Sequence, residues 1–369
     1  MNRGDVTPPP ANTPPASPAR RLRVGVIGLG IGQMHIDGWR QHPQVEVVAI
    51  ADTDPARLAQ VGDKHAIAAR HTDPLALLAL ADGAGALDVV SICVPNKHHL
   101  PLTLAALGAG CHVLCEKPMA LSAAEGRQML DAARVAGKRL MINFSYRFSA
   151  QSRALKAQVD AGFFGDFYFG RSVWHRRRGM PGFGGWFGQK AWSGGGPLID
   201  LGVHRLDLAL WLMGYPQPTW VMGSTYDPIA RAAAARSGKA FDVEDLAAAF
   251  IRFDNGASLV LEASWAANIR EAELMETRLL GTRAGLLQHN LGEGYDFDAH
   301  LFYEQDGAQY DLRLHPTGAI GLSAMHDYAQ AILDDTPHPA PGEEGLVVMQ
   351  ILDAIYESAR LGEPVKIVV

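Results

Sequence analysis

The chain has 369 residues, of which 48% are hydrophobic and 20% are charged, and its formal net charge is −6. This composition is typical of a globular protein with sizeable cores, and the acidic balance gives no indication of nucleic acid or an anionic membrane as a partner. The three cysteines form no Cys-x-x-Cys motif and no apolar run is long enough to span a membrane, so we expect a reduced, cytoplasmic protein.

Residues 1–20 differ in composition from the rest of the chain. The stretch MNRGDVTPPPANTPPASPAR is rich in proline, alanine and threonine and shows no apolar periodicity. It also lacks the apolar segment of a secretory signal peptide. We therefore predict a disordered tail over residues 1–20.

Residues 21–145 alternate between strand and helix patterns. Apolar, β-branched segments predict strands, and helix-like segments lie between them. The predicted strands are 22–30, 45–52, 66–70, 86–95, 111–118 and 139–145, and the predicted helices are 32–42, 55–66, 99–110 and 122–137. This order indicates an α/β domain with a doubly wound parallel sheet, in which ligands bind at the carboxyl ends of the strands.

A glycine cluster follows the first predicted strand. Gly28, Gly30, Ile31 and Gly32 lie between that strand and the next helix. Glycines let the backbone approach a pyrophosphate, and a helix N-terminus favours its negative charge. Gln33 stands where the third glycine of G-x-G-x-x-G is expected, so an ordinary tight turn remains an alternative.

Three further strand ends carry polar residues. Asp52 ends the second strand, where an acid can accept hydrogen bonds from both ribose hydroxyls of NAD and repel the 2′-phosphate of NADP. NAD is therefore the preferred cofactor and NADP the alternative, although Asp52 could instead cap a helix. VPNKHH (94–99) and EKP (116–118) end two other strands, and Lys117 is either an active-site cation or a solvated surface charge.

The βαβ pattern stops after about residue 144. We expect a helix at 149–161, a strand at 167–178, and helices at 320–334 and 343–361. Further strands are predicted at 218–226, 246–253, 256–266, 271–290, 298–304, 308–314 and 365–369. Residues 146–369 should thus form an α+β domain with a large, mostly antiparallel, open-faced sheet. Helices cover one face, and the other is expected to bury against a second subunit in a homodimer or homotetramer.

The segment GGGPLIDLGVH (194–204) begins a predicted buried helix. Pro197 suits the first helical turn, and the apolar run stops at Gly214. Asp200 and His204 are spaced i, i+4 and project from the same side, and Asp207 extends the stripe. Because buried charges are costly unless paired, the two side chains either bond to each other or line a cavity.

A basic run, HRRRG (175–179), follows the strand predicted at 167–178. Its arginines, Arg178 among them, could bind a polar or anionic substrate. A solvated strand end is the alternative interpretation, and charge runs are more often of this kind.

Together these motifs resemble the glucose–fructose oxidoreductase / inositol dehydrogenase / rhizopine-catabolism family (Gfo/Idh/MocA). The resemblance covers residues 21–369. It rests on GLGIGQMH (28–35), VPNKHH (94–99), EKP (116–118), NFSYRF (143–148) and GGGPLIDLGVH (194–204). It implies a Rossmann domain over 21–145, an open-faced sheet domain over 146–369, and NAD(P)-dependent oxidoreduction of sugars, inositols or related polyols.

The resemblance also implies roles for individual residues. Lys117, Asp200 and His204 are the implied catalytic residues. They are expected to contact substrate together with Tyr146 and with Arg178 of the basic run. The implied cofactor-binding residues are Gly28, Gly30, Ile31, Gly32, Asp52, Pro95, Asn96, His99, Glu116, Lys117 and Trp186. Many members have an arginine after that tryptophan, whereas this chain has Phe187. No metal site is expected.

The expected reaction is hydride transfer between a secondary alcohol and the nicotinamide. His204 would be the general base, Asp200 would hold a substrate hydroxyl, and Lys117 would stabilise the developing alkoxide. One alternative is an NAD-dependent glycosidase that acts by transient oxidation and elimination. A second alternative is a non-catalytic, nucleotide-sensing regulator, which the presence of both the lysine and the histidine disfavours.

Overall fold

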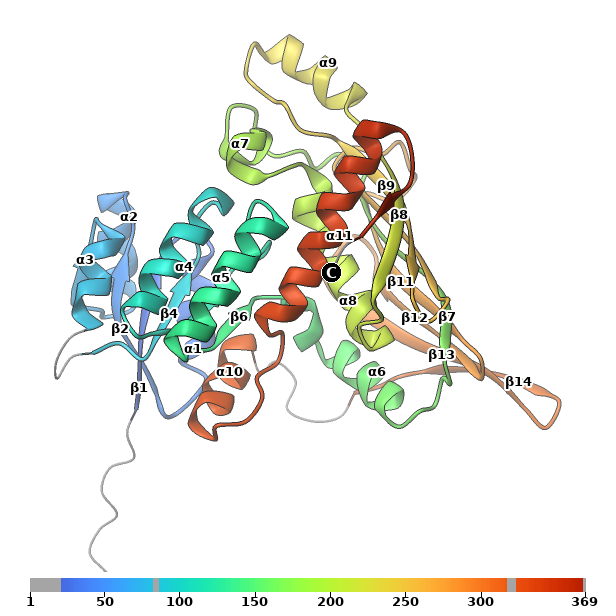
Figure 1. The fold of residues 1–369 in the computed structure, drawn as a ribbon, viewed down its shortest axis with the longest axis horizontal. Helices are drawn as coiled ribbons and strands as arrows, with labels where there is room; N and C mark the ends of the chain where they lie inside the picture. Colours follow the sequence, from blue (N-terminus) through green and yellow to red (C-terminus); the bar gives the residue numbers. More distant parts are fainter. Residues whose placement is uncertain (1–20, 82–85, 317–322, 368–369) are drawn as a thin grey trace, which may run out of the picture.

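The structure is a computed structural model that describes residues 21–81, 86–316 and 323–367. The tail predicted over residues 1–20 lies outside the described residues. The described chain builds two sheets that stand side by side, with helices between them (Figure 1).

The first sheet is parallel and has the strand order β3-β2-β1-β4-β5-β6. Its strands are β1 (Leu22–Ile27), β2 (Val45–Ala51), β3 (Ala69–His71), β4 (Val89–Ile92), β5 (His112–Cys115) and β6 (Leu140–Ile142). Its helices are α1 (Gly32–Trp39), α2 (Pro55–Lys64), α3 (Pro74–Leu78), α4 (His99–Gly108) and α5 (Ala123–Ala136). The predicted doubly wound sheet is confirmed by this order and by the parallel pairing, and its strands are mostly apolar and buried.

The sixth strand is shorter than predicted. It ends at Ile142 because the backbone turns there: the amide of Phe144 donates to the carbonyl of Ile142. A short 3₁₀-helix (Ser145–Phe148) follows and carries Tyr146 toward the second sheet.

The second sheet has the order β14-β13-β12-β11-β7-β10-β9-β8-β15. Its strands are β7 (Phe167–Arg176), β8 (Pro218–Tyr226), β9 (Leu246–Phe253), β10 (Ser258–Ser264), β11 (Glu273–Gly281), β12 (Ala284–Asn290), β13 (Phe297–Gln305), β14 (Ala308–Arg313) and β15 (Val365–Lys366). All neighbours are antiparallel except β7 and β10, so the predicted mostly antiparallel sheet is confirmed. The β11–β12 hairpin accounts for the predicted strand 271–290.

The remaining helices are α6 (Ala150–Asp160), α7 (Lys190–Ser193), α8 (Val203–Met213), α9 (Pro228–Ser237), α10 (Ala324–Leu333) and α11 (Gly342–Leu361). In Figure 1, α6, α8 and α11 lie on the side of the second sheet that faces the first, and no helix of the described chain lies on its outer side. Helix α9 was not predicted from the sequence, which offers only an alanine-rich stretch there.

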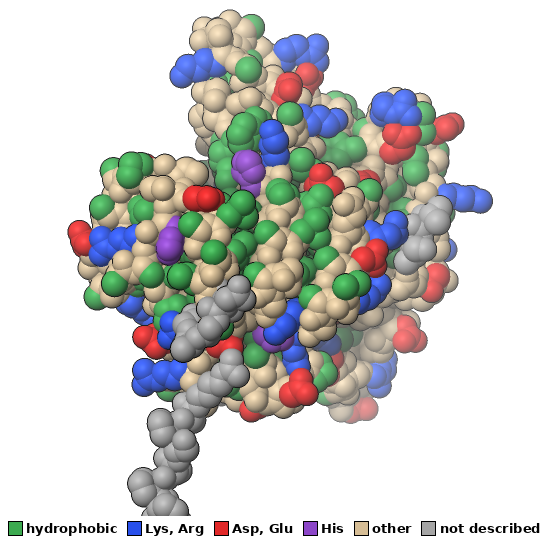
Figure 2. Space-filling model, turned by 60° about the vertical axis from the view of Figure 1, so that its left-hand side comes forward, with side chains coloured by type: hydrophobic (Ala, Val, Ile, Leu, Met, Phe, Trp, Pro, Cys, Tyr) green, Lys and Arg blue, Asp and Glu red, His purple; other side chains and the backbone are tan. Residues whose placement is uncertain are grey.

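Helix α11 connects the two halves of the fold, since it packs against both β8 and α5. An isolated bridge between Met141 and Pro341 adds a second link. On the face shown in Figure 2, positive and negative side chains are interspersed without a large area of one sign. Among the described helices, none combines the length and the apolar character that crossing a bilayer requires.

Candidate active site

A cavity of about 1300 Å³ lies between the two sheets. It is bounded by the carboxyl ends of β1, β2, β4 and β5 on one side and by α8 and β7 on the other. Its walls include Gly28, Asp52, Asn96, Lys117, Asp200 and His204. This volume is large enough for a dinucleotide and a small substrate together, because sites for single small molecules measure about 300–1000 Å³.

The glycine cluster forms one end of this cavity. Gly28 has a φ of +86°, and a Cβ there would collide with the carbonyl oxygen of Cys93, so only glycine fits. A Cβ at Gly30 would project into open space, which leaves the backbone of the turn accessible. Gly32 does not line the cavity. A Cβ at this position would crowd Val26 in the core.

Asp52 lies beside that turn with its carboxylate on the cavity wall. One oxygen accepts the amide of Leu29 at 2.7 Å and the other accepts the amide of Asp54 at 2.9 Å. The cap of α2 is Asp54, whose side chain accepts the amides of Ala56 and Arg57. Asp52 is therefore free of the capping role and fixed at the edge of the glycine turn.

Of the three residues predicted to bind cofactor after β4, two line the cavity and one does not. Pro95 and Asn96 line it, and the Asn96 amide donates to the carbonyl of Ser193 at 2.7 Å. His99 is buried away from the cavity wall, with its ring nitrogens 2.8 Å from the Pro118 carbonyl and 2.9 Å from the Val94 carbonyl. His99 thus links the segments that follow β4 and β5.

Glu116 orients the strand end that carries Lys117. Its carboxylate lies 2.7 Å from the His35 ring and accepts the Asn143 amide at 2.7 Å. Burial alone would raise the pKa of Glu116, but these hydrogen bonds and the charge on Lys117 lower it. Glu116 is therefore ionised and held in place, and it fixes the backbone from which Lys117 extends.

Lys117 and Asp200 join the two halves of the site. The Lys117 ammonium donates to the backbone carbonyl and to Oδ1 of Asp200, both at 3.0 Å. The other carboxylate oxygen, Oδ2, accepts the Trp265 indole at 3.0 Å. Burial would raise the pKa of Asp200, but Lys117 and Trp265 together lower it, so the carboxylate stays charged.

The segment around Asp200 is one turn of π-helix (Leu198–Gly202) that continues into α8. The three glycines before it have different roles. Gly194 has a φ of +86°, whereas a Cβ at Gly195 would collide with Tyr356 and one at Gly196 with Glu244. The Glu244 carboxylate accepts the amides of Gly196 and Leu198 and so caps the turn from a distant loop.

His204 projects into the cavity from the first turn of α8. Its ring packs edge-on against Tyr146 at 4.9 Å and beside Trp174 at 5.8 Å between centroids. Burial lowers the pKa of His204 well below its usual value, and the cations at Lys117 and Arg205 lower it further. The imidazole is therefore neutral, and its buried Nδ1 has no hydrogen-bond partner within the described ranges.

Asp200 and His204 do not bond to each other in the described structure, because Asp200 is engaged by Lys117 and Trp265. The extension of the stripe to Asp207 was wrong. Asp207 does not line the cavity but is buried in an ion pair with Arg147 and a hydrogen bond from Tyr215.

The structure places Arg178 outside the cavity, where it donates to Asn268 at 2.8 Å. Strand β7 ends at Arg176, and it is this arginine that reaches the cavity, held by Glu273 at 2.9 Å. Trp186 lines the cavity, and Phe187 stacks on it with a centroid distance of 3.8 Å.

Sequence reasoning missed the aromatic wall opposite the glycine turn. Trp174, Tyr295 and Phe297 line the cavity around Tyr146. They come from β7, from β13 and from the loop before it. No local pattern distinguishes them from core residues, so only the strand pairing could have identified them.

Models of two protein families match the chain. One is described as "Oxidoreductase family, NAD-binding Rossmann fold" and matches residues 22–144. The other is the GFO/IDH/MocA C-terminal domain and matches residues 152–287. The first match spans all six strands of the first sheet, and the second spans β7 to β11 and part of β12 in the second sheet.

Several known proteins are similar to this chain. D-glucoside 3-dehydrogenase of Escherichia coli (strain K12) is 34% identical over 355 residues, which cover 94% of this chain and 97% of that protein. Myo-inositol 2-dehydrogenase of Thermotoga maritima is 29% identical over 245 residues, covering 66% of this chain and 68% of that protein. D-xylose 1-dehydrogenase (NADP(+)) 2 of Haloferax volcanii is 28% identical, with 94% of this chain and 100% of that protein covered.

Solved structures share the same fold. The aldose-aldose oxidoreductase of Caulobacter crescentus, complexed with glycerol, is 25% identical with a TM-score of 0.80, covering 94% of this chain and 100% of that one. Levoglucosan dehydrogenase in complex with NADH and levoglucosan gives 24% identity and a TM-score of 0.81, with 94% and 100% covered. With both family models and a full-length relative in agreement, the chain belongs to the Gfo/Idh/MocA family of oxidoreductases with an NAD-binding Rossmann domain.

Proposed function

We propose that this enzyme is an NAD-linked dehydrogenase that oxidises a secondary hydroxyl group of a sugar, with D-glucosides and related pyranosides as its substrate class. One observation carries the proposal: Lys117, Asp200 and His204 line the same cavity as the Gly28 turn and Asp52. The D-glucoside 3-dehydrogenase at 34% identity supports the substrate class.

The cavity fits a nicotinamide dinucleotide. The open backbone at Gly30 offers room for a pyrophosphate, and Asp52 is placed for the hydroxyls of the adjacent ribose. Pro95 and Asn96 follow β4, and Lys117 follows the neighbouring strand β5, where the nicotinamide half would bind. When bound, the cofactor accepts the hydride of the alcohol carbon. Asp52 supports NAD over NADP, because a carboxylate repels a 2′-phosphate.

The protein's own residues supply the proton chemistry. The neutral imidazole of His204 accepts the proton of the reacting hydroxyl, and the surrounding apolar wall excludes water from it. Lys117 donates a hydrogen bond to the same oxygen and stabilises the charge that develops there. Asp200 holds Lys117 in place and retains lone pairs for a neighbouring substrate hydroxyl.

The aromatic wall suits a sugar ring. Trp174, Tyr146 and Phe297 present apolar surfaces, and Arg176 adds a polar group at the edge of this wall. A pyranoside has an apolar face and a rim of hydroxyls, and this combination of surfaces can bind both.

A panel of D-glucosides, aldoses and inositols tests the function, with NAD⁺ and NADP⁺ compared for each compound. We expect reduced cofactor to accumulate with a D-glucoside and NAD⁺, as followed by its absorbance. Release of the aglycone without net cofactor reduction would instead indicate the glycosidase cycle. No reaction with any member of the panel would contradict the substrate class.

We further propose that the open face of the second sheet mediates a homodimer or homotetramer. Cross-strand register places Met222 opposite Phe250, and Tyr226 and Phe302 are also exposed large side chains on this face. Exposed apolar surface of this kind is typical of an interface. Sedimentation should show an oligomer that the Phe250→Glu variant dissociates, whereas a monomeric wild-type protein would contradict the proposal.

We also propose a reducing compartment, the cytoplasm, as the location. The three cysteines Cys93, Cys111 and Cys115 are free and buried. Titration of the unfolded, unreduced protein should give three thiols per chain.

A further inference from the structure

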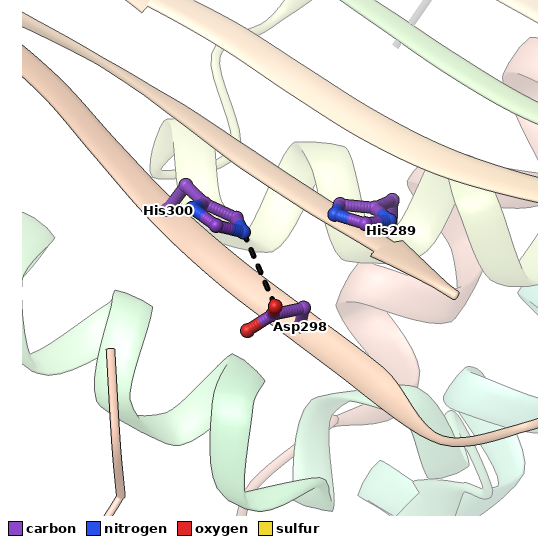
Figure 3. A group of neighbouring side chains, drawn as sticks. All are labelled: His289, Asp298 and His300. Atoms are coloured by element: carbon purple, nitrogen blue, oxygen red, sulfur yellow. Dashed lines mark ion pairs between the residues drawn. The ribbon is translucent and has the colours of Figure 1, made fainter. Parts of the chain in front are cut away.

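Two histidines and an aspartate cluster on the open face of the second sheet, away from the cofactor cavity (Figure 3). His289 lies on β12, and Asp298 and His300 lie on β13. The strand register sets His289 directly opposite Asp298, and His300 follows two residues later on the same face. Figure 3 shows the two rings pointing toward each other, with the carboxylate beside the gap between them.

The three side chains have the geometry of metal ligands. One ligand atom from each lies within 4.8 Å of the other two, so a single point lies within about 2.8 Å of all three. Bonds from Zn²⁺ to imidazole nitrogen and carboxylate oxygen are about 2.0–2.2 Å, a difference that small side-chain rotations close. Two imidazoles and a carboxylate are ligands that suit zinc and similar divalent transition metals.

The surroundings orient these ligands. Nδ1 of His289 lies 3.1 Å from the carbonyl of Asn290 and so carries its proton there, which leaves the Nε2 lone pair directed to the cluster. Asp298 is buried and accepts the amide of Ala299 at 3.0 Å. Nε2 of His300 lies 3.2 Å from the Asp298 carboxylate. The Asn290 carbonyl and the Ala299 amide are outer partners of the kind that metal-binding histidines and carboxylates commonly have, whereas the His300–Asp298 contact lies between two of the proposed ligands.

Arg313 already pairs with the carboxylate of the cluster. Its Nε lies 2.8 Å from Oδ1 and 2.7 Å from Oδ2 of Asp298, and its side chain is 51% exposed. A carboxylate has about four lone-pair sites, so Asp298 can keep one bond to Arg313 while it binds a metal. The Arg313 guanidinium competes with a metal for the Asp298 carboxylate but leaves one of its lone pairs available.

We propose that His289, Asp298 and His300 form a binding site for a divalent transition metal, best matched by Zn²⁺, which ties β12 to β13 on the open face. Water completes the coordination. No metal site was expected from the sequence. The spacing of nine and two residues between the three side chains matches no ligand motif, and the strand pairing brings them together. This proposal is independent of the dehydrogenase function.

The test uses the full-length, tag-free protein stripped with a chelator. Titration calorimetry with Zn²⁺ should show one strong site per chain, and the metal should remain bound through gel filtration. We expect His289→Gln and His300→Gln each to weaken binding at least tenfold. The matched control is His326→Gln in α10, which removes a histidine that also lies beside an aspartate, Asp327, and should leave binding unchanged.

A second measurement on the wild-type protein does not depend on how the variants fold. In the wild-type protein diluted to its monomer, so that no second subunit covers the open face, Zn²⁺ should protect His289 and His300, but not His326, from modification by diethyl pyrocarbonate, as read by mass spectrometry. The proposal is overturned if the wild-type protein retains no zinc. It is equally overturned if protection falls on other histidines, or if folded His289→Gln and His300→Gln variants bind zinc as the wild type does.

Discussion

Replacing Lys117 by methionine removes the only cation that bonds to Asp200 in the described structure while keeping a side chain of similar length. The substitution deletes two hydrogen bonds of 3.0 Å and leaves the carboxylate with the Trp265 indole alone. The transition state also loses the positive charge beside the reacting oxygen. Removing one such donor costs about 10²–10³ in kcat, or roughly 3–4 kcal/mol.

The same substitution has a structural cost. Asp200 becomes a partly buried carboxylate that keeps only the weaker influence of the Arg176 charge, so the cost lies below the roughly 3–5 kcal/mol of breaking a fully buried pair. Part of that cost disappears when Asp200 takes up a proton, since the pKa of its carboxyl rises once Lys117 is absent. The double variant Lys117→Met/Asp200→Asn should therefore regain stability but not turnover.

The assay is the steady-state formation of NADH from a D-glucoside, with cofactor affinity measured separately by NADH fluorescence. We expect kcat to fall at least a hundredfold while the Kd of NADH changes less than about threefold. Lys64→Met, in the exposed last turn of α2, is the matched control and should have wild-type kcat. A Lys117→Met enzyme within tenfold of wild-type kcat would refute the reasoning.

Three further predictions concern other parts of the site and its support. His204→Gln should lower kcat by about 10²–10⁴. In the wild-type enzyme the pKa of His204 is depressed, so kcat/KM should hold steady as pH falls through 6.5 and decline only below it. Asp52→Ser should lower the ratio of kcat/KM for NAD⁺ over NADP⁺ at least tenfold, because the charge that repels a 2′-phosphate is gone. Asp207→Asn should destabilise the protein by about 3 kcal/mol in urea unfolding, because Arg147 loses its buried partner.

Each of these has a result that contradicts it. A loss of kcat/KM beginning above pH 6.5 would mean that His204 is not the group that titrates. Unchanged cofactor preference in Asp52→Ser would assign that selectivity to other residues. For the buried ion pair, Arg147→Met combined with Asp207→Asn should recover much of the lost stability, and full additivity of the two losses would contradict the pairing.

Much of the first sheet could be predicted because its strands are short apolar runs separated by turn and cap residues, such as Asp54 before α2. Strands buried on both faces leave this signature in the sequence itself. The glycine turn and Lys117 could be predicted for the same reason, since a strand end is a local feature. The i, i+4 spacing also placed Asp200 and His204 on the same cavity wall.

Other parts of the site depend on contacts that no local pattern encodes. The basic run could not indicate which arginine faces the cavity, because β7 ends at Arg176 and the alternation of side chains stops there. Asp207 has the spacing of a cavity residue, but Arg147 binds it from another segment. No sequence pattern marks Glu244 either, although its carboxylate caps the turn that presents Asp200.

The turn before Asp200 is held in place partly by a residue of α11, far along the chain. Tyr356, in α11, donates its hydroxyl to Glu244 at 2.9 Å, and Glu244 holds the backbone before Asp200. During synthesis on the ribosome, the strands and Lys117 emerge long before α11 does. A nascent chain can thus collapse around its first sheet and still lack an assembled reaction centre, which is completed only when the last helix leaves the exit tunnel.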